Sequence, residues 1–146
     1  MEIIVKKFYE LSLDELYEIV KSRELVFHME QKVTDIDFDD VDKTSYHMFA
    51  LENGKLIGYI RIYNDENNKD IVHLGRFLTI VRRKGYGRKI FKDAVDYSIN
   101  KLHAKRIEIH AQTYVKDLYK EFGFIEYGMP FYEAGIEHIK MALNHN

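Results

Sequence analysis

The chain has 146 residues, of which 46% are hydrophobic and 32% charged, a composition that suits one folded domain and excludes a disordered protein. Its 22 lysine and arginine residues against 24 acids give a net charge of −2, so it lacks the cationic surplus of a general nucleic-acid binder. It contains no cysteine, which excludes disulfides, a cysteine nucleophile and thiolate metal sites and agrees with a cytoplasmic location.

The first third of the chain combines a strand, helical segments and an acidic loop. Residues 2–8 predict a strand, with Ile3, Val5 and Phe8 beside charged neighbours, in a segment too charged for a signal peptide. Ser12, followed three residues later by Glu15, forms a capping box, and helical spacing then predicts one or two helices to about Glu30. Asp35, Asp37 and Asp39 are spaced like the start of a calcium loop, but its sixth position is Asp40 rather than glycine and its twelfth Tyr46 rather than glutamate, so we expect no metal there. Two interpretations of this acidic loop remain: a solvated loop, or an acceptor-binding rim that attracts cationic amines.

The rest of the chain alternates strands with helices, and no apolar run is long enough to span a bilayer. We expect strands at residues 46–51, 56–63, 71–78, 106–111, 124–127 and 136–143, and helices at residues 85–102 and 115–122. Asn53-Gly54 predicts a hairpin, Gly123 a helix end, and Pro130 a loop between the last two strands. Hairpins together with crossovers predict an α+β (mixed α/β) domain over residues 1–146, with one mixed sheet flanked by helices.

The turn at residues 82–88, Arg-Arg-Lys-Gly-Tyr-Gly-Arg, is the most informative segment. It follows a strand and opens a long helix, whose first unpaired N–H groups and dipole attract an anion. The glycines let a phosphate approach the backbone closely. The spacing matches neither a P-loop nor a dinucleotide fingerprint. A merely solvated basic face, or a nucleic-acid patch, is the alternative on charge alone, but the strand before the turn and the helix after it favour a pyrophosphate site.

These residues resemble a known family. Arg82-x-x-Gly85-x-Gly87 is similar to the signature of the GNAT acetyltransferases, whose loop grips the pyrophosphate of acetyl-CoA. Residues 118–124, Leu-Tyr-Lys-Glu-Phe-Gly-Phe, resemble a second GNAT segment at the correct distance. The resemblance implies the GNAT acyl-CoA N-acyltransferase fold, with a largely antiparallel mixed sheet.

Other stretches resemble the ElaA-like GNAT proteins, so that the likeness covers nearly the whole chain. They are residues 17–31, the spaced Asp39, Asp42 and His47, the pair Ala111-Gln112, and residues 133–141. Two departures stand out. The segment between Arg76 and Arg82 is about two residues shorter than in those proteins and lacks their proline, and Glu137 replaces a proline before His138.

The resemblance implies an acetyl-CoA-dependent N-acetyltransferase in which a primary amine attacks directly in a ternary complex. It implies cofactor contacts from Phe77, Leu78, Thr79, Arg82, Arg83, Lys84, Gly85, Tyr86, Gly87, Arg88 and Gln112. It makes Tyr119 the acid that protonates the departing thiolate, whereas a core tyrosine is the alternative on the residue alone. Candidate bases are Glu30, His47, His73, Glu133 and His138, of which Glu30 and His138 gain most from the resemblance. A water chain with no dedicated base is the other option.

The acceptor is expected to be a small molecule, because the chain carries no added recognition module. Its pocket would be lined by Glu30, Asp39, Asp42, His47, Glu133 and His138, with His47 and Glu133 as binding residues. We expect no metal, nucleic-acid or membrane partner, and a homodimer is an open option. The alternative function is a non-catalytic acyl-CoA-binding module, against which Tyr119 and the histidines argue.

Overall fold

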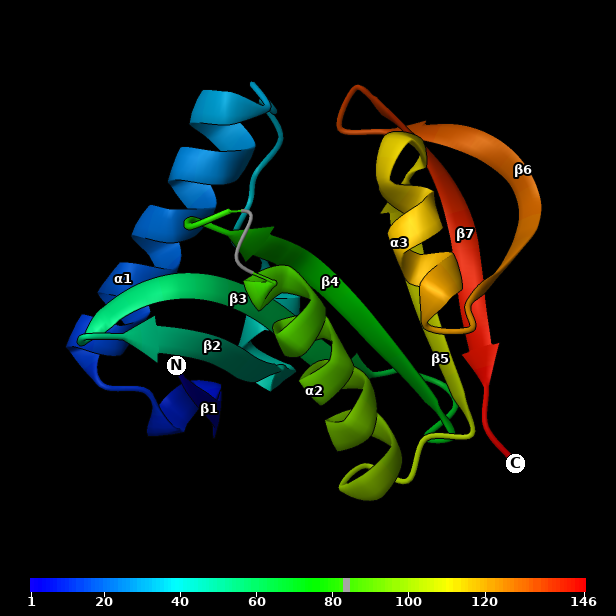
Figure 1. Cartoon of the computed structure of the whole chain (residues 1–146), viewed down its shortest axis with the longest axis horizontal. Coiled ribbons are helices and arrows are strands. Elements are labelled where there is room, and N and C mark those ends of the chain that lie inside the picture. The colour runs from blue at the N-terminus through cyan, green and yellow to red at the C-terminus, as the bar shows by residue number, and fades with distance from the viewer. Residues whose placement is uncertain (83–84) are drawn as a thin grey trace.

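One seven-stranded mixed sheet runs through the molecule in the computed structural model, which describes residues 1–82 and 85–146 (Figure 1). The strands are β1 (Glu2–Lys7), β2 (Tyr46–Glu52), β3 (Lys55–Asn64), β4 (Ile71–Thr79), β5 (Arg106–Gln112), β6 (Ile125–Glu133) and β7 (Ile136–Asn144). Their order is β1-β2-β3-β4-β5-β7-β6, and β4 with β5 is the parallel pair among otherwise antiparallel neighbours. The mixed, largely antiparallel sheet expected from the sequence is confirmed.

The helices lie where capping and periodicity place them. They are α1 (Leu13–Arg23), α2 (Tyr86–Asn100) and α3 (Lys116–Glu121), with the π-helical η2 (Glu24–Glu30) continuing α1 and short 3-10 turns η1 (Phe8–Glu10), η3 (Asp40–Thr44) and η4 (Thr113–Val115). The capping box is present, because the Glu15 amide donates to Ser12 Oγ at 3.1 Å and the Ser12 amide donates to Glu15 Oε1 at 2.8 Å. No helix in the described parts of the chain is long and apolar enough to cross a membrane.

Two apolar cores cover the two faces of the sheet. Neighbouring residues of β3 point to opposite faces, so that Ile60 packs with Ile90 of α2 in one core and Tyr59 packs with Ile19 of α1 in the other. Gly58 allows the close approach of α2, since a Cβ there would lie 2.2 Å from Ile90 Cδ1. Figure 1 shows α2 lying across the strands on one face, with α3 beside β5 and β7.

β4 and β5 stay paired along their first halves and then separate. Their pairing ends where Leu74 lies opposite Ile109. Beyond that point β4 bulges opposite Ile60, and Arg76 within the bulge adopts a left-handed φ of 53°. A bulge bends its strand, so β4 diverges from β5 toward the carboxyl ends of both, as Figure 1 shows.

The Asn53-Gly54 hairpin between β2 and β3 and the helix end at Gly123 are present. The loop expected around Pro130 is wrong. β6 runs through Pro130, at a register irregularity between Tyr127 and Phe131. A proline is tolerated there because β6 is the edge strand of the sheet and an irregularity removes the demand for its missing N–H.

Candidate active site

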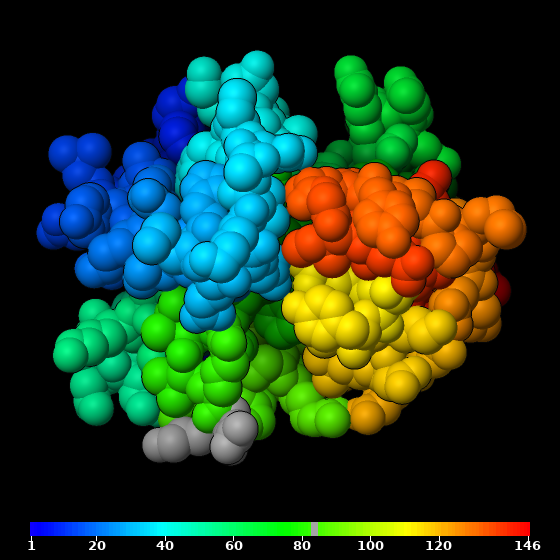
Figure 2. Space-filling view, turned by 90° about the horizontal axis from the view of Figure 1, so that it is seen from above, coloured from blue at the N-terminus to red at the C-terminus, as the bar shows by residue number. Residues whose placement is uncertain are grey.

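The open ends of β4 and β5 form a cleft of about 970 Å³. One wall comes from η2, β4 and the start of α2, and the other from β5, α3 and β7. Figure 2 shows the two halves meeting, with the segment after α1 on one side and α3 with the β6–β7 turn on the other. Residues far apart in the sequence therefore face a shared space.

The amino-terminal end of α2 lies at one end of this cleft. Gly85 caps the helix with a left-handed φ of 73°, which a residue with a side chain adopts only at a cost. Gly87 lines the cleft, and a Cβ there would lie 3.5 Å from Thr79 and 3.6 Å from Phe77. The first N–H groups of this 15-residue helix have no partner within the helix and suit a phosphate. These residues fit the pyrophosphate of a CoA thioester.

The structure brings most of the expected cofactor residues to the cleft. Phe77, Leu78, Thr79, Arg82, Gly87 and Gln112 line it. The Tyr86 and Arg88 side chains point elsewhere: the Tyr86 hydroxyl donates to Glu52, and Arg88 forms an ion pair with Glu121. Their contribution to a cofactor would therefore come from the backbone. Arg83 and Lys84 lie outside the described residues.

Tyr119 of α3 reaches the cleft from the wall opposite β4. Its ring packs against Phe91 of α2, with 5.0 Å between the ring centres. Burial raises the pKa of Tyr119 to about 12. The hydroxyl therefore stays protonated at neutral pH and can donate a hydrogen bond, whereas complete proton transfer to a free thiolate of pKa about 8.5 would be uphill. Burial of the thiolate in the same cleft reduces the difference between the two pKa values, because burial also raises the pKa of a thiol.

His138 of β7 points one ring nitrogen at the backbone and the other at the cleft. Its Nδ1 lies 2.7 Å from the carbonyl oxygen of Ile136, and since a carbonyl only accepts, Nδ1 carries the hydrogen. The neutral ring then has its lone pair on Nε2, which lies 3.8 Å from Glu133 Oε2. The ring stacks on Phe131 and is 6% exposed. This histidine is oriented to accept a proton from the cleft.

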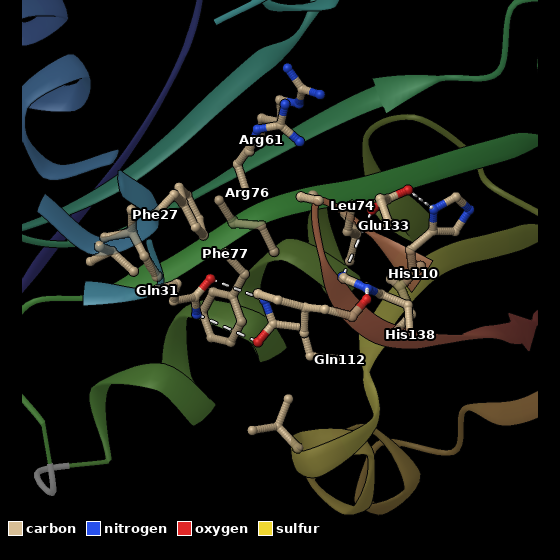
Figure 3. Close-up of a pocket in the computed structure, with 18 of the residues that line it drawn as sticks. Phe27, Gln31, Arg61, Leu74, Arg76, Phe77, His110, Gln112, Glu133 and His138 are labelled. Carbon is tan, nitrogen blue, oxygen red and sulfur yellow. Dashed lines mark hydrogen bonds and ion pairs between the residues drawn. The ribbon is translucent and has the colours of Figure 1, made fainter. Parts of the chain in front are cut away.

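Glu133 stands beside His138 with its carboxylate held in place. His110 Nδ1 donates to Glu133 Oε1 at 3.0 Å, and this hydrogen bond, helped by the positive charge of Arg76, holds the pKa of Glu133 below its ordinary value against the effect of burial. The carboxylate is therefore ionised over the whole neutral range. Figure 3 shows His110, Glu133 and His138 together on the β5–β7 side of the cleft.

Glu30 is the last residue of η2 and Gln31 follows it. Their side chains bind residues on two different walls of the cleft. Glu30 Oε2 accepts from Arg82 Nη2 at 2.9 Å, so the expected catalytic carboxylate is ion-paired at the exposed rim. Gln112 Nε2 donates to Gln31 Oε1 at 3.1 Å, and Gln31 Nε2 lies 3.5 Å from Gln112 Oε1. Figure 3 shows this amide pair passing beside Phe77.

His47 lies outside the cleft, which corrects the expectation that it binds the acceptor. It is fully buried, its Nε2 donates to the carbonyl of Asp42 at 2.8 Å, and its Nδ1 accepts from the Tyr59 hydroxyl at 2.6 Å. Burial lowers the pKa of His47 below its ordinary value. Both ring nitrogens are engaged, so this histidine holds β2, β3 and the loop before β2 together. His73, another candidate base, does line the cleft, but its Nε2 is bonded to Asp65 Oδ1 at 2.8 Å.

The acidic loop is fastened to the sheet by a closed ring of six alternating charges. In order around the ring these are Arg23, Asp42, Arg61, Asp39, Arg76 and Asp37, with successive nitrogen–oxygen distances of 2.7, 3.1, 2.8, 3.6, 2.9 and 2.8 Å. Arg23 is fully buried and lies 3.9 Å from the centre of the Phe38 ring. Burial acts to raise the pKa of Asp42, but the hydrogen bond and charge of Arg23 outweigh it, so the pKa lies below its ordinary value.

The ring bears on both interpretations of the acidic loop. Asp37, Asp39 and Asp42 are ion-paired within it, whereas Asp35 and Asp40 are exposed to solvent. Asp42 is 1% exposed and lies outside the cleft, whereas Asp39 reaches the cleft with its carboxylate bound to Arg61 at 2.8 Å. Among the described residues there is no group of three or more histidine, aspartate or glutamate side chains placed to hold a metal ion.

Sequence reasoning missed several residues of the cleft. Arg61, Arg76, His110 and Gln31 all line it, yet none was assigned a site role. One signal was available: Arg61 is a single charge inside the apolar run of residues 56–63, and a charge in a buried strand needs a partner. Nothing in the sequence indicates the bulge that turns Arg76 into the cleft.

The comparisons with known proteins agree with this geometry. The family model described as the acetyltransferase (GNAT) domain matches residues 15–145. The chain is 30% identical to the protein ElaA of Escherichia coli over 137 residues, which are 91% of this chain and 90% of that protein. The crystal structure of E. coli ElaA has a TM-score of 0.89 at 28% identity and 97% coverage of both chains. That of an acyl-CoA N-acyltransferase from Pseudomonas aeruginosa has a TM-score of 0.90 at 25% identity, covering 97% of this chain and 99% of the other.

A mixed sheet split between two parallel strands, with the amino-terminal end of a helix at the split, is the architecture of an acyl-CoA-dependent acyltransferase. The chain belongs to the GNAT acetyltransferase family and, within it, to the ElaA-like proteins. Its assignment as an enzyme is thereby confirmed. Acyl-homoserine lactone synthases such as LasI share the fold, with a TM-score of 0.79 at 18% identity over 98% of this chain and 90% of LasI, a likeness that concerns the fold alone.

Proposed function

We propose that the chain transfers an acetyl group from acetyl-CoA to a primary amine of a small molecule, by direct attack in a ternary complex. The observation that carries this proposal is the orientation of His138. Its Nδ1 is committed to the Ile136 carbonyl and its Nε2 lone pair faces the cleft beside an ionised carboxylate. The match to an acetyltransferase family supports the acetyl group, and the absence of cysteine agrees with the cytoplasm as the compartment.

Glu133 and His138 together can bind an amine and remove its proton. At neutral pH an aliphatic amine is protonated, and the Glu133 carboxylate attracts the resulting ammonium ion. With 3.8 Å between Glu133 Oε2 and His138 Nε2, one nitrogen atom can lie within hydrogen-bonding distance, about 3 Å, of both. The proton passes to Nε2, and the neutral amine can then attack the thioester carbon.

Tyr119 of α3, on the same wall of the cleft as His138, serves the leaving group. As the nitrogen–carbon bond forms and the carbon–sulfur bond breaks, negative charge collects on the sulfur. The buried Tyr119 hydroxyl stays protonated and stabilises that charge by donating to it. Backbone N–H groups at the start of α2 bind the phosphates and fix the thioester between the two walls.

The proposal is tested by release of free thiol from acetyl-CoA across a panel of small amines, amino acids and amino sugars. We expect turnover with a subset of these amines, and an N-acetylated product by mass spectrometry. His138→Asn should lower the turnover number by about 10²-fold or more. His145→Asn is the matched control, because this histidine is exposed near the chain end. Tight acetyl-CoA binding without amine-dependent thiol release across the panel would contradict the proposal and favour a binding module.

A further inference from the structure

Arg76 presents part of its guanidinium group to the cleft in a fixed orientation. Its Nε donates to Asp37 Oδ1 at 2.9 Å and its Nη2 donates to the Asp37 carbonyl at 2.9 Å. Within the described parts of the chain, no acceptor lies within hydrogen-bonding distance of Nη1. The side chain is 28% exposed and lines the cleft. The two N–H bonds of Nη1 are thus held ready for a ligand.

The backbone at Arg76 is strained. Arg76 adopts φ 53° inside the β4 bulge, a left-handed conformation that costs a side-chain-bearing residue about 1 kcal/mol or more. A bulge re-aims the side chain that it carries, and such outliers gather at functional sites. Gly75 before it adds no side chain, and the only neighbour within 4 Å of its missing Cβ is Arg61 Nε, at 3.9 Å.

The Glu133 carboxylate, on the other wall of the cleft, is the negative pole opposite Arg76. The charge of Arg76 helps to lower the pKa of Glu133, so the two groups act on each other. They are nevertheless not an ion pair in the structure, and each is held by other residues, Arg76 by Asp37 and Asp39 and Glu133 by His110. Figure 3 shows Arg76 on the β4 side of the cleft and Glu133 on the β5–β7 side. A ligand between them meets a cation at one end and an anion at the other.

We propose that the acceptor is an amine that also carries a carboxylate, such as a free amino acid, and that Arg76 binds this carboxylate. The inference rests on the proposed function, since Glu133 and His138 receive the amine. A planar guanidinium is the side chain best suited to a carboxylate, and the pair is a strong, charge-assisted hydrogen bond. Arg76 is then the specificity-determining residue, and the acceptor's own dipole matches the two poles of the cleft.

The test measures binding by calorimetry in the presence of CoA, so that it does not depend on turnover. The probes form two matched series: leucine, leucinamide and isopentylamine, and lysine, lysinamide and 1,5-diaminopentane. In at least one series we expect the amino acid to bind tenfold or more tightly than its amide and its decarboxylated amine. Arg76→Gln should remove that preference, and Arg76→Lys should restore part of it. Glu133→Gln is the matched variant at the other pole and should weaken all three members of a series alike.

The outcomes separate the two proposals. Equal binding of acid, amide and amine by the wild-type protein would overturn the inference without any variant. An acid preference that survives in a folded Arg76→Gln protein would overturn the role of Arg76. Thiol release with the same probes then tests the function: turnover of amines regardless of a carboxylate would leave the proposed function standing and the inference refuted. Arg76-dependent binding of amino acids without thiol release would support the role of Arg76 in binding a carboxylate and would refute the proposed acetyl transfer.

Discussion

Gln31 and Gln112 join their side-chain amides across the cleft, with Gln112 Nε2 donating to Gln31 Oε1 at 3.1 Å. The two residues end segments on opposite walls, η2 and β5. A thioester lying between the walls must displace this pair or replace one of its members. Gln112 is expected from the family resemblance to contact the cofactor, so we infer that Gln31 competes with acetyl-CoA for it.

Gln31→Ala should therefore tighten acetyl-CoA binding, whereas Gln112→Ala should weaken it. The shorter hydrogen bond of the pair, at 3.1 Å, sets the size of both effects, and a net value of about 0.5–1.5 kcal/mol corresponds to about 2–12-fold in the dissociation constant. Calorimetric titration of both variants beside the wild type measures the two effects. Equal weakening by the two substitutions would show that the pair holds the cofactor jointly and that no competition exists.

Gly87 offers a direct test of the phosphate site. Gly87→Asp places a carboxylate where the pyrophosphate is expected, and acetyl-CoA binding should fall at least tenfold, about 1.4 kcal/mol. The fold should survive, because an acidic residue in the first turn of a helix is favourable to the helix dipole. Gly87→Ala is the matched control, since its Cβ would make only ordinary contacts at 3.5 and 3.6 Å. Unchanged affinity in a folded Asp variant would contradict the assignment.

His47 should make the stability of the protein depend on pH. Its folded pKa lies below the ordinary value of about 6.5, because burial disfavours the charged ring. Between the folded pKa and about 6.5, the unfolded chain binds a proton at this residue that the folded chain does not. The free energy of unfolding should fall as pH drops through that window, by at most about 1.4 kcal/mol per pH unit. Above about pH 6.5, the titration of His47 should add no further pH dependence to it.

Urea titrations between pH 5 and 8 on the wild type and on His47→Gln measure this effect. The difference between the two proteins isolates His47 from the other six histidines of the chain, since seven are present in total. The variant should be less stable at pH 8, where the bonds to Asp42 and Tyr59 are intact in the wild type, and the gap should narrow toward pH 5. A gap independent of pH would mean that the folded ring accepts a proton as easily as the unfolded one.

Local patterns predicted the fold well because they are local in origin. The capping box at Ser12, the Asn53-Gly54 turn and the helix end at Gly123 each act within a few residues, and all are present. Pro130 shows the limit of such signals: whether a proline ends a strand depends on whether that strand lies at the sheet edge, which only the topology decides.

The site was predictable where backbone geometry makes it and less so where charges pair over long distances. Phe77–Thr79 and Gly87 line the cleft, as the family resemblance implies. His47 and Asp42 were interpreted as acceptor residues because their spacing resembles that of the ElaA-like proteins. Their partners, Tyr59 and Arg23, lie 12 and 19 residues away, and no spacing rule joins them. The ring that contains Asp42 could be recognised only once β3, β4 and the loop were placed together.

The kinetics of the Tyr119→Phe variant distinguish a catalytic from a structural role for this tyrosine. Tyr119→Phe removes one hydroxyl and keeps the ring against Phe91, so the melting temperature and acetyl-CoA affinity should change little. The turnover number should fall by about 10²-fold, because the hydrogen bond to the sulfur is needed only as the carbon–sulfur bond breaks. With a pKa of about 12, Tyr119 itself should add no ionisation to the rate profile below pH 10. Tyr114→Phe is the control, a tyrosine that also lines the cleft and whose ring is exposed. A full turnover number in the Tyr119 variant, measured with an active amine beside a thermal melt, would assign the leaving group's stabilisation to water or to another group.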